Sequence, residues 1–325
     1  MVELVESLSP AQPFLCAVED LEKATAFENL QAVQESRTRA QLKIQEGCDR
    51  YCTYCVIPYA RGPLRSRPLS DIHSQLARLG ENGYSEVVLT GIHLMSYGKD
   101  LGDGVNLLDA IRQGQDIPGI QRIRLGSLEP QLLSDAFVQA LAENPKICRQ
   151  FHLSLQSGSA TVLRRMARRY TPDEYAQWVA RLREAMPGCA ITTDVICGFP
   201  QETEEEFSAT LAFLEECRFA AMHVFPYSIR PGTRAADMPQ VPGPVKEERA
   251  ARAGALAARL HREFLEGCVG ETYPVLFEQP VAGRYGGHAP NYMEVAVPGG
   301  ENLHNQVLPV RITGTDGEIL LGEVQ

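Results

Sequence analysis

Three cysteines that stand close together, Cys48, Cys52 and Cys55, constrain this chain more than any other feature of its sequence. They form a C-x3-C-x2-C pattern, and the residues between them are mostly polar, so the segment does not suit an apolar core. Three thiolates cannot complete the four-cysteine shell of a four-iron cluster, and one iron would stay open to another ligand. The pattern therefore predicts a loop that holds an open iron–sulfur cluster.

Zinc is the competing interpretation of the three cysteines. A structural zinc ion takes four ligands, and its cysteines and histidines commonly come in two pairs. No second Cys-x-x-Cys pair lies nearby, and His73 and His93 stand alone in the sequence. The open cluster is therefore favoured over zinc. The cysteines that stand singly are expected to be small buried residues, namely Cys16, Cys148, Cys189, Cys197 and Cys217.

The composition predicts a soluble globular protein of two or three domains. The chain has 325 residues, of which 44 % are apolar. It contains no apolar run of about 18 residues, the length that would indicate a membrane span. No basic and apolar leader follows Met1, and nine cysteines, an odd number, argue against a disulfide scaffold. We therefore expect a cytoplasmic protein with reduced thiols and no membrane partner.

The net charge of −10 is unevenly distributed. Residues 1–35 contain seven acidic residues and one basic residue. Three groups of arginines follow, which are Arg61, Arg65 and Arg67; Arg164, Arg165, Arg168 and Arg169; and Arg230 and Arg234. Such groups could contact phosphates whatever the sign of the total charge. Solvated helix faces and internal ion pairs would explain them equally well, and both interpretations stay open.

Segments of strand length alternate with amphipathic helical segments from residue 40 to residue 267. The predicted strands are Glu86–Gly91, Gln121–Gly126, Phe151–Leu155, Ala190–Ile196 and Met222–Phe225. Thr171 and Thr203 each precede a glutamate by three residues, which is the pattern of a capping box at the start of a helix. Repeated βα units imply a parallel sheet with right-handed crossovers. Periodicity does not decide between a barrel and a doubly wound sheet.

Short strand-like segments replace this alternation after Gly267. They are Thr272–Glu278, Tyr292–Val297, Leu308–Thr313 and Glu318–Leu321. Asp316-Gly317, between the last two, is a strong hairpin signal. The segments predict a small β-barrel at the end of the chain. Such barrels often bind oligonucleotides, although a purely structural appendage is an open alternative.

Together these motifs resemble the radical S-adenosylmethionine methylthiotransferases, and among them the MtaB type, which modifies threonylcarbamoyladenosine in tRNA. The resemblance is closest at residues 43–68, around the cysteine loop. It continues through residues 89–93, 126–130, 152–159, 164–171, 193–203, 225–233 and 291–295. It thus covers the chain almost without interruption from residue 40 onward.

The resemblance implies an α/β fold: a partial (β/α)6 TIM-like barrel at residues 40–267, followed by an OB-like TRAM β-barrel that binds RNA at residues 268–325. It implies a [4Fe-4S] cluster on Cys48, Cys52 and Cys55, with S-adenosylmethionine on the open iron. One electron would cleave this cofactor to a 5′-deoxyadenosyl radical, which abstracts the hydrogen at C2 of adenine before a methylthio group is installed. The implied partners are tRNA, a flavodoxin- or ferredoxin-like reductant and a sulfur donor.

Further candidates for cofactor binding lie at predicted strand ends or in the family motifs. They are Gly91, Glu129, Gln156, Ser157, Asp194 and Arg230. Barrel enzymes place ligand-binding groups at the carboxyl ends of their strands. A turn glycine at Gly91 and loop capping by the others are the alternatives. Arg61 and Arg65 are candidates for contact with substrate or phosphate, and no residue is assigned a catalytic step.

Members of this family normally carry a further N-terminal domain, in which three cysteines hold a second cluster linked to sulfur insertion. Only Cys16 precedes Cys48 here, so residues 1–39 are expected to be a remnant of that domain or the linker after it. The main functional prediction is a methylthiotransferase for threonylcarbamoyladenosine next to the anticodon. The alternatives are a related enzyme for another tRNA adenosine or a ribosomal protein, and a non-catalytic tRNA-binding protein.

Overall fold

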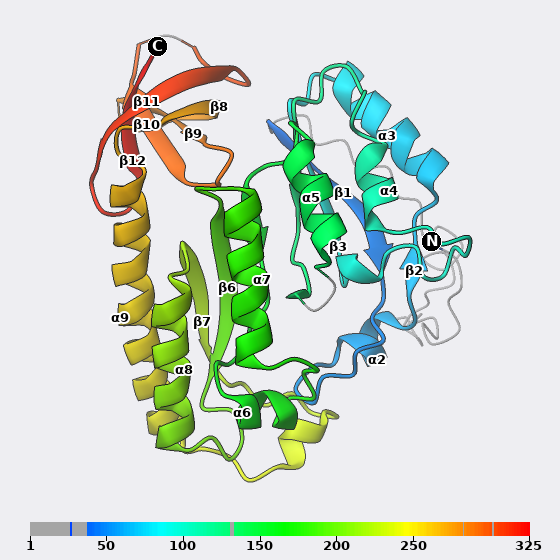
Figure 1. Ribbon diagram of the computed structural model, residues 1–325, viewed down its shortest axis with the longest axis vertical. Coiled ribbons are helices and arrows are strands. Elements are labelled where there is room, and N and C mark those ends of the chain that lie inside the picture. The colour runs from blue at the N-terminus through cyan, green and yellow to red at the C-terminus, as the bar shows by residue number, and fades with distance from the viewer. Residues whose placement is uncertain (1–26, 28–37, 131–132, 282, 301) are drawn as a thin grey trace, which may run out of the picture.

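The computed structural model describes residues 27, 38–130, 133–281, 283–300 and 302–325 (Figure 1). Cys16 and nearly all of the predicted remnant therefore lie outside the described residues. In the part that is described, helices and strands alternate up to α9, and a compact group of strands follows. None of the described helices combines the length and the apolar composition that crossing a bilayer requires.

Six parallel strands form the first and larger part of the fold. They are β1 (Arg39–Glu46), β3 (Glu86–Gly91), β4 (Arg122–Leu125), β5 (Gln150–His152), β6 (Ala190–Cys197) and β7 (Ala221–Pro226). The short β2 (Arg65–Ser66) adds an antiparallel edge to β1. Isolated parallel bridges, Ile123–Ile147 and Leu128–Leu153, join β4 to the segment that contains β5. The strands therefore follow one another in chain order, as in a partial (β/α)6 barrel and not a doubly wound sheet.

Helices connect these strands and cover one side of them (Figure 1). They are α2 (Ile57–Arg61), α3 (Leu69–Glu81), η2 (Leu94–Ser96), α4 (Leu107–Arg112), α5 (Asp135–Glu143), α6 (Ala160–Arg165), α7 (Pro172–Ala185), α8 (Glu204–Cys217), η4 (Arg234–Asp237) and α9 (Gly243–Gly267). The two predicted capping boxes are confirmed, at Thr171 before α7 and Thr203 before α8. In each, the threonine hydroxyl accepts a hydrogen bond from the backbone N–H of the glutamate. The glutamate carboxylate in turn accepts one from the backbone N–H of the threonine.

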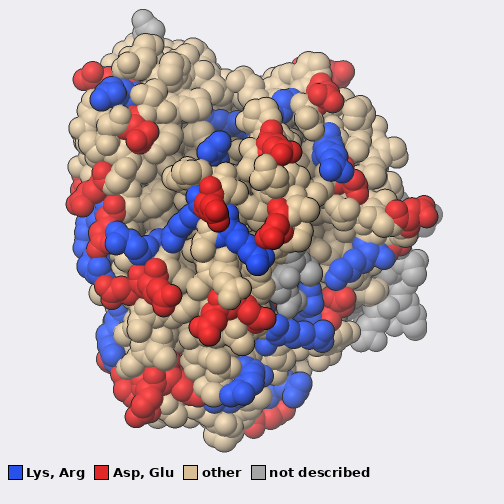
Figure 2. Space-filling view, viewed as in Figure 1, with Lys and Arg blue, Asp and Glu red and all other residues tan. Residues whose placement is uncertain are grey.

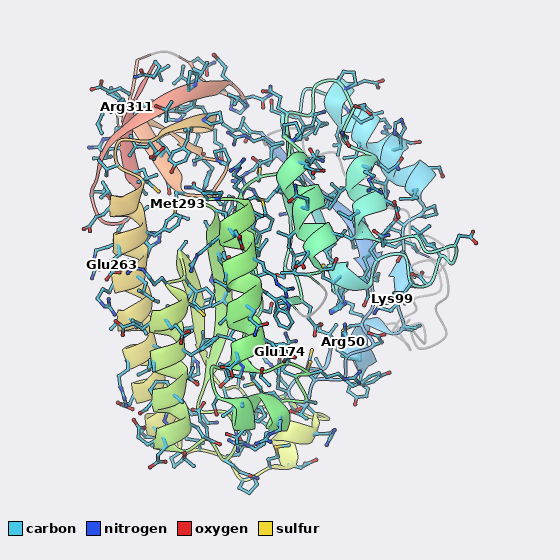
Figure 3. The ribbon with its side chains drawn as sticks, viewed as in Figure 1. Arg50, Lys99, Glu174, Glu263, Met293 and Arg311 are labelled. Atoms are coloured by element: carbon cyan, nitrogen blue, oxygen red, sulfur yellow. The ribbon has the colours of Figure 1, made fainter. Side chains whose placement is uncertain are left out.

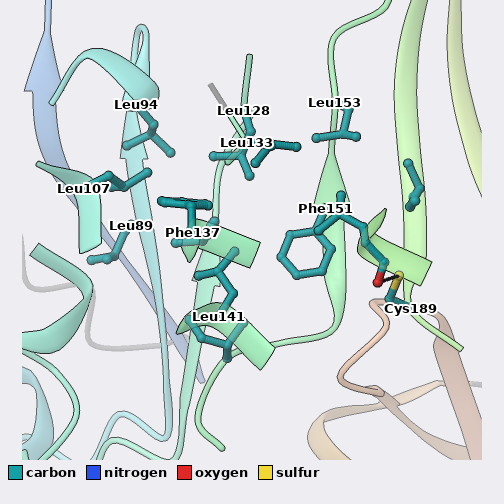
Figure 4. Close-up of a cluster of buried hydrophobic side chains, with 14 of the residues drawn as sticks. Leu89, Leu94, Leu107, Leu128, Leu133, Phe137, Leu141, Phe151, Leu153 and Cys189 are labelled. Carbon is teal, nitrogen blue, oxygen red and sulfur yellow. Dashed lines mark hydrogen bonds between the residues drawn. The ribbon is translucent and has the colours of Figure 1, made fainter. Parts of the chain in front are cut away.

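Burial alternates along β1 and toward the carboxyl-terminal ends of β3 and β6, because helices cover only one face of these strands. Leu42 in β1, Leu89 in β3 and Val195 in β6 are among the residues that face the helices and fill the main apolar core. Figure 4 shows this layer, with Phe137 and Leu141 of α5 near Phe151 of β5. The opposite face is largely polar and more exposed, and it includes Gln41, Lys43, Thr90, Asp194 and His223. The barrel interior is therefore lined by polar groups.

The end of the chain forms a closed five-stranded β-barrel, which confirms the prediction of a small barrel there. Its strands are β8 (Thr272–Val281), β9 (Arg284–His288), β10 (Glu294–Pro298), β11 (Val307–Thr315) and β12 (Leu320–Val324). Sequence reasoning missed β9, because its two glycines hide the strand pattern. Gly287 is required there, since a Cβ would lie 2.4 Å from the carbonyl oxygen of Leu276. Tyr292 was expected in a strand but adopts a φ of 67° in the turn before β10.

A buried ionic group attaches this β-barrel to the amino-terminal ends of the parallel strands. Glu86 is fully buried, with one carboxylate oxygen 2.7 Å from Arg124 Nε and the other 3.4 Å from Arg122 Nη1. Arg122 also donates to the carbonyl oxygen of His288, and Arg124 to that of Pro290. The Arg124 guanidinium lies 4.4 Å from the centre of the Tyr292 ring. The two parts of the fold thus share one network of charges and aromatic contacts.

Glu86→Gln is expected to lower the free energy of unfolding by about 3–5 kcal/mol, because it leaves two buried guanidinium groups without a counter-charge. Glu248→Gln is the matched control, since Glu248 is half-exposed and pairs with Arg252 at the surface. We expect the control to cost less than about 1 kcal/mol. Urea unfolding followed by circular dichroism measures both. Equal effects of the two substitutions would contradict the role given to Glu86.

Candidate metal centre and cofactor site

The three predicted ligands, Cys48, Cys52 and Cys55, lie on one loop between β1 and α2, at the carboxyl-terminal end of the strand. All three are free thiols and half-buried. Gly47 begins the loop with a φ of 74°, and a Cβ at this position would lie 1.8 Å from the carbonyl oxygen of Pro63. Only glycine combines this backbone angle with such a close approach. The entry into the loop is therefore fixed by Gly47.

The far side of the loop is held by α6 and by η4. The backbone N–H of Thr53 donates to the carbonyl oxygen of Met166 at 3.0 Å, and its hydroxyl donates to that of Arg165 at 2.8 Å. The N–H of Ala235 donates to the carbonyl oxygen of Thr53 at 2.8 Å. Below the loop, Tyr54 packs edge-on against the buried Phe199. These contacts fix the conformation of the loop and thereby the positions of its three thiols.

The environment of the thiols suits a metal cluster better than free thiolates. Burial, together with the neighbouring Cys52 and Cys55, raises the pKa of Cys48 to about 11. Burial likewise raises the pKa of Cys55. Arg168 Nη1 lies 3.8 Å from Cys52 Sγ and supplies positive charge. Metal ions deprotonate the cysteines that ligate them, so three neighbouring thiols with one cation beside them fit the donor set of an open cluster.

Glu129, a predicted cofactor-binding residue, lies in a charged group beside this loop. Its Oε2 is 3.1 Å from Arg50 Nε and is hydrogen-bonded to His93 Nε2. Burial opposes the charge of Glu129, but the hydrogen bond from His93 and the charges of Arg168 and Arg50 hold its pKa below the usual value. His93, which stands alone in the sequence, thus has a close partner in the fold. Figure 3 shows Arg50 near α2, at the opposite end of the fold from Met293 of the β-barrel.

Gly91 allows β3 to approach β1 closely. A Cβ on Gly91 would lie 2.8 Å from Gln45 Cβ. Gln45 is fully buried, and its amide donates to the carbonyl oxygen of Gly47 at 2.9 Å while its Oε1 accepts from the N–H of His93 at 2.6 Å. Gln45 thus ties the start of the cysteine loop to the turn after β3. Close strand packing, and not a positive φ, is what requires glycine at Gly91.

The other predicted residues occupy different surroundings. Gln156 has a φ of 74°, and its N–H donates to the carbonyl oxygen of Asp194. Ser157 is fully buried, and its hydroxyl contacts Thr210 on α8. The Asp194 carboxylate lies 3.0 Å from His152 Nε2, and Arg230 is exposed after β7. Of the six predicted residues, Glu129 and Gly91 lie in the contacts that surround the cysteine loop. A cofactor role for all six stays a prediction.

Four of the nine arginines in the predicted basic groups are at least partly buried and make internal contacts. Arg65 is buried and donates to the carbonyl oxygens of Pro63 and Arg61, and its contact with substrate or phosphate stays a prediction. Arg165 pairs with Glu206 at 2.5 Å, and Arg168 donates to the carbonyl oxygen of Ser154. Figure 2 shows basic and acidic residues intermixed over the visible face. The ion-pair interpretation therefore holds for Arg165 and for Arg67, which pairs with Asp71. Both interpretations stay open for the exposed arginines, which are Arg61, Arg164, Arg169, Arg230 and Arg234.

Three residues beside the candidate centre escaped sequence reasoning, namely Gln45, Arg50 and His93. Arg168 was noticed only as part of a basic group. Their roles depend on contacts with distant parts of the chain, such as the pair of Arg50 with Glu129. Arg50 stands inside the cysteine motif, and its position among polar residues was the one local signal that could have drawn attention to it.

Comparison with known sequences assigns the chain to a family. Residues 42–214 match the sequence profile of the Radical SAM superfamily. The chain is 41 % identical over 303 residues to threonylcarbamoyladenosine tRNA methylthiotransferase MtaB of Bacillus subtilis, which covers 91 % of this chain and 67 % of that protein. The chain belongs to the radical SAM tRNA methylthiotransferase family. It is therefore a member of an enzyme family of transferases whose cofactors are a [4Fe-4S] cluster and S-adenosylmethionine.

A second kind of relative is equally similar. The chain is 41 % identical over 277 residues to the tRNA-2-methylthio-N(6)-dimethylallyladenosine synthase of Acetivibrio thermocellus, covering 85 % of this chain and 58 % of that protein. A synthase with the same name from Symbiobacterium thermophilum is 39 % identical, and the chain covers 65 % of it. The chain thus spans about two thirds or less of the length of these relatives. Their two names differ in the adenosine that is modified.

Solved structures support the fold. The radical S-adenosylmethionine methyltransferase TsrM from Kitasatospora setae, with cobalamin and a [4Fe-4S] cluster bound, matches 76 % of this chain and 42 % of its own with a TM-score of 0.51. Coproporphyrinogen III oxidase from Escherichia coli, a radical SAM enzyme, matches 70 % of this chain and 54 % of its own with a TM-score of 0.52. Both are 16 % identical to this chain, so they show a shared architecture alone.

Gly47→Ala is expected to prevent correct formation of the cysteine loop, because the added Cβ would overlap the carbonyl oxygen of Pro63 and the positive φ would be strained. We expect the iron content after anaerobic reconstitution to fall by more than half. Gly83→Ala is the control, since Gly83 also has a positive φ but no atom lies within 4 Å of its Cβ position. Similar iron loading of the two variants would show that Gly47 does not determine the loop.

Glu206→Gln tests whether the pair of Glu206 with Arg165, on the helix that contacts the cysteine loop, stabilises the fold. The quantity that tests it is the pH dependence of stability. Glu206 accepts hydrogen bonds from Arg165, Thr161 and the N–H of Thr203, and although partial burial opposes its charge, these bonds lower its pKa from 4.5 to about 2. A lowered pKa stabilises the fold above pH 4.5, and this contribution is lost as the pH falls toward 2. We expect the substitution to cost about 1.5–3 kcal/mol at pH 7.

The same comparison at low pH provides the check. Thermal unfolding of the cluster-free protein should show a difference in melting temperature between wild type and Glu206→Gln that shrinks as the pH is lowered from 4.5 toward 2. A difference that stays constant over this range would show that the charge of Glu206 does not contribute.

Proposed function

We propose that the chain carries the radical-generating and substrate-binding part of a tRNA methylthiotransferase, with Cys48, Cys52 and Cys55 as the ligands of its [4Fe-4S] cluster. The observation that carries the proposal is the pre-formed loop of three half-buried thiols at the carboxyl ends of the strands, beside a polar barrel interior. Ligand-binding groups occupy this end of the strands in barrel enzymes. The proposed location is the cytoplasm, where the thiols stay reduced.

When bound, the cluster and S-adenosylmethionine supply one-electron chemistry that yields a 5′-deoxyadenosyl radical. The residues of this chain position and shield that chemistry. Arg168 lies beside Cys52 and balances thiolate charge. Glu129, kept ionised by His93 and Arg50, presents an acceptor that suits an amino group of the cofactor. Gln45 holds the cysteine loop against the turn after β3 through its hydrogen bonds to both.

We propose threonylcarbamoyladenosine as the adenosine that is modified, in preference to dimethylallyladenosine. The support is the polar lining of the barrel interior, with Gln41, Lys43 and Thr90 on neighbouring strands. A threonylcarbamoyl group offers a carboxylate and a hydroxyl to such groups. An aliphatic dimethylallyl group would instead desolvate them without forming hydrogen bonds. The proposed partners are tRNA, with the β-barrel as a TRAM-like RNA-binding part, a flavodoxin- or ferredoxin-like reductant and a sulfur donor.

The first test is cleavage of S-adenosylmethionine by the full chain. After anaerobic reconstitution and reduction with dithionite, we expect 5′-deoxyadenosine to form and the Cys48/Cys52/Cys55→Ala variant to form at least 100-fold less. Cys217→Ala is the matched control, because it removes a buried thiol on α8 that is remote from the loop. Chromatography of the nucleoside products measures the outcome. No product from a fully loaded cluster would overturn the radical-enzyme proposal.

The second test measures the binding of two anticodon stem-loop RNAs. One carries threonylcarbamoyladenosine and the other carries dimethylallyladenosine. Tighter binding of the threonylcarbamoyl RNA supports the proposed substrate, and tighter binding of the dimethylallyl RNA would reject it. Binding should weaken steeply with salt, because phosphate neutralisation releases counterions. RNA binding by a protein that takes up no cluster would favour the alternative of a non-catalytic tRNA-binding protein.

A further inference from the structure

A cavity of about 1040 Å³ lies where the β-barrel, the end of α9 and the amino-terminal ends of β5 and β6 meet. Figure 1 shows how α9 leads into the β-barrel at this place. The wall of the cavity combines residues just before β5 and β6 with residues of α9 and β8, among them Arg149, Cys189, Phe264 and Tyr273. The cysteine loop follows the opposite, carboxyl-terminal end of β1. Because ligand pockets often form between domains, the cavity is a candidate for a second binding site.

The wall on the side of the β-barrel is held in place by the buried ionic group around Glu86. Arg122 donates a hydrogen bond to the carbonyl oxygen of Pro274, which is a wall residue. Arg124 donates in the same way to the carbonyl oxygen of Pro290, which is another. Both arginines are buried and pair with Glu86. The cavity is therefore formed in advance, and little reorganisation would oppose the binding of a ligand.

Two arginines give one part of the wall a positive charge that no carboxylate balances. Arg149 is exposed, and Arg183 of α7 is held by hydrogen bonds from its Nη2 to the carbonyl oxygens of Cys217 at 2.7 Å and Arg218 at 2.8 Å. Among the residues that the structure describes, neither Arg149 nor Arg183 has an ion-pair partner. Burial raises the pKa of Cys189 to about 11, against the opposing charges of Arg183 and Arg149. Both guanidinium groups thus lie near the same buried thiol.

Flat apolar groups form much of the remaining wall. They are the rings of Phe264, Tyr273, Pro145, Pro187, Pro274 and Pro290. The wall contains three arginines and two glutamates, so one positive charge is in excess. One of the glutamates, Glu263, already pairs with Arg218 and Arg259. The cavity therefore offers flat apolar surfaces together with a site for a negative charge.

We propose that this cavity binds a small organic anion with a flat ring, whose carboxylate or phosphate contacts Arg149 and Arg183 and whose ring packs beside Phe264. A guanidinium presents a planar fork of donors that matches the oxygens of a carboxylate or phosphate. A flat ring gains stabilisation against an aromatic side chain beyond simple burial.

Such a ligand would contact both the parallel strands and the β-barrel. Since it binds only the folded arrangement, it stabilises the junction between these two parts. Its effect is on this junction and not on the reaction, which the cysteine loop at the opposite ends of the strands would serve. The inference goes beyond the proposed function, because it uses neither the cluster nor the RNA.

The test compares two fluorescent probes of nearly the same shape. Anilinonaphthalene sulfonate has flat rings and a negative charge, and phenylnaphthylamine has the same rings without the charge. Both are titrated into the full chain. We expect Arg149→Ala to weaken binding of the anionic probe about fivefold and to leave the neutral probe unaffected. The control is Arg181→Ala, which removes an equal charge from the surface of α7, where Arg181 pairs with Asp135. Equal binding of the anionic probe by these two variants would overturn the assignment of an anion to the cavity.

A second pair of variants tests where the probes bind. Gly267, the last residue of α9, lines the cavity, and no atom lies within 4 Å of its Cβ position. Gly267→Phe places a large side chain there and should weaken both probes about tenfold, because it takes the space of their rings. Gly254→Phe is the matched control, since Gly254 stands elsewhere on α9 and also has no atom within 4 Å of its Cβ position.

Thermal unfolding separates binding from folding. The anionic probe should raise the melting temperature of the wild type and of Gly254→Phe, and it should not raise that of Gly267→Phe. All three proteins should have the same circular dichroism spectrum before heating. The proposal is overturned if the wild type does not bind the anionic probe, or if Gly267→Phe binds it as tightly as Gly254→Phe.

Discussion

The structure depends on one constraint: helices cover only one face of the parallel strands. Parallel sheets are usually buried on both faces, and their strands are then apolar throughout. Here Leu42 and Leu89 face the helices, while Lys43 and Thr90 face the interior on the same two strands. The polar interior remains partly open, because polar groups there could not be buried without losing their hydration. The space that a polar substrate needs thus follows from the strand pattern.

The two ends of the strands serve different purposes. At the amino-terminal ends, the fully buried Glu86 and its two arginines fasten the β-barrel to the sheet. At the carboxyl-terminal ends lie the cysteine loop, Glu129 and Arg230. Barrel enzymes separate stability from ligand binding in the same way.

Much of this fold could be predicted from local patterns. β3 was predicted residue for residue, β6 within one residue, and both capping boxes at Thr171 and Thr203 were confirmed. The short β5 and the glycine-rich β9 were harder, because a strand of few residues or without side chains carries little periodic signal. Tyr292 was misplaced because alternation continued through a residue that the structure places in a turn. Local signals therefore identified most elements, and they located the ends of long periodic strands better than those of short ones such as β5.

The sequence by itself determined the three-thiol loop, the alternation of strands and helices, and the family to which the chain belongs. These follow from spacing and periodicity, which are properties of neighbouring residues. Only the tertiary structure decided that His93 and Arg50 meet Glu129, that Arg65 is buried, and that Arg149, Arg183 and Phe264 line one cavity. Such contacts join residues tens of positions apart, and the arrangement of the parallel strands side by side, which no local pattern encodes, brings them together.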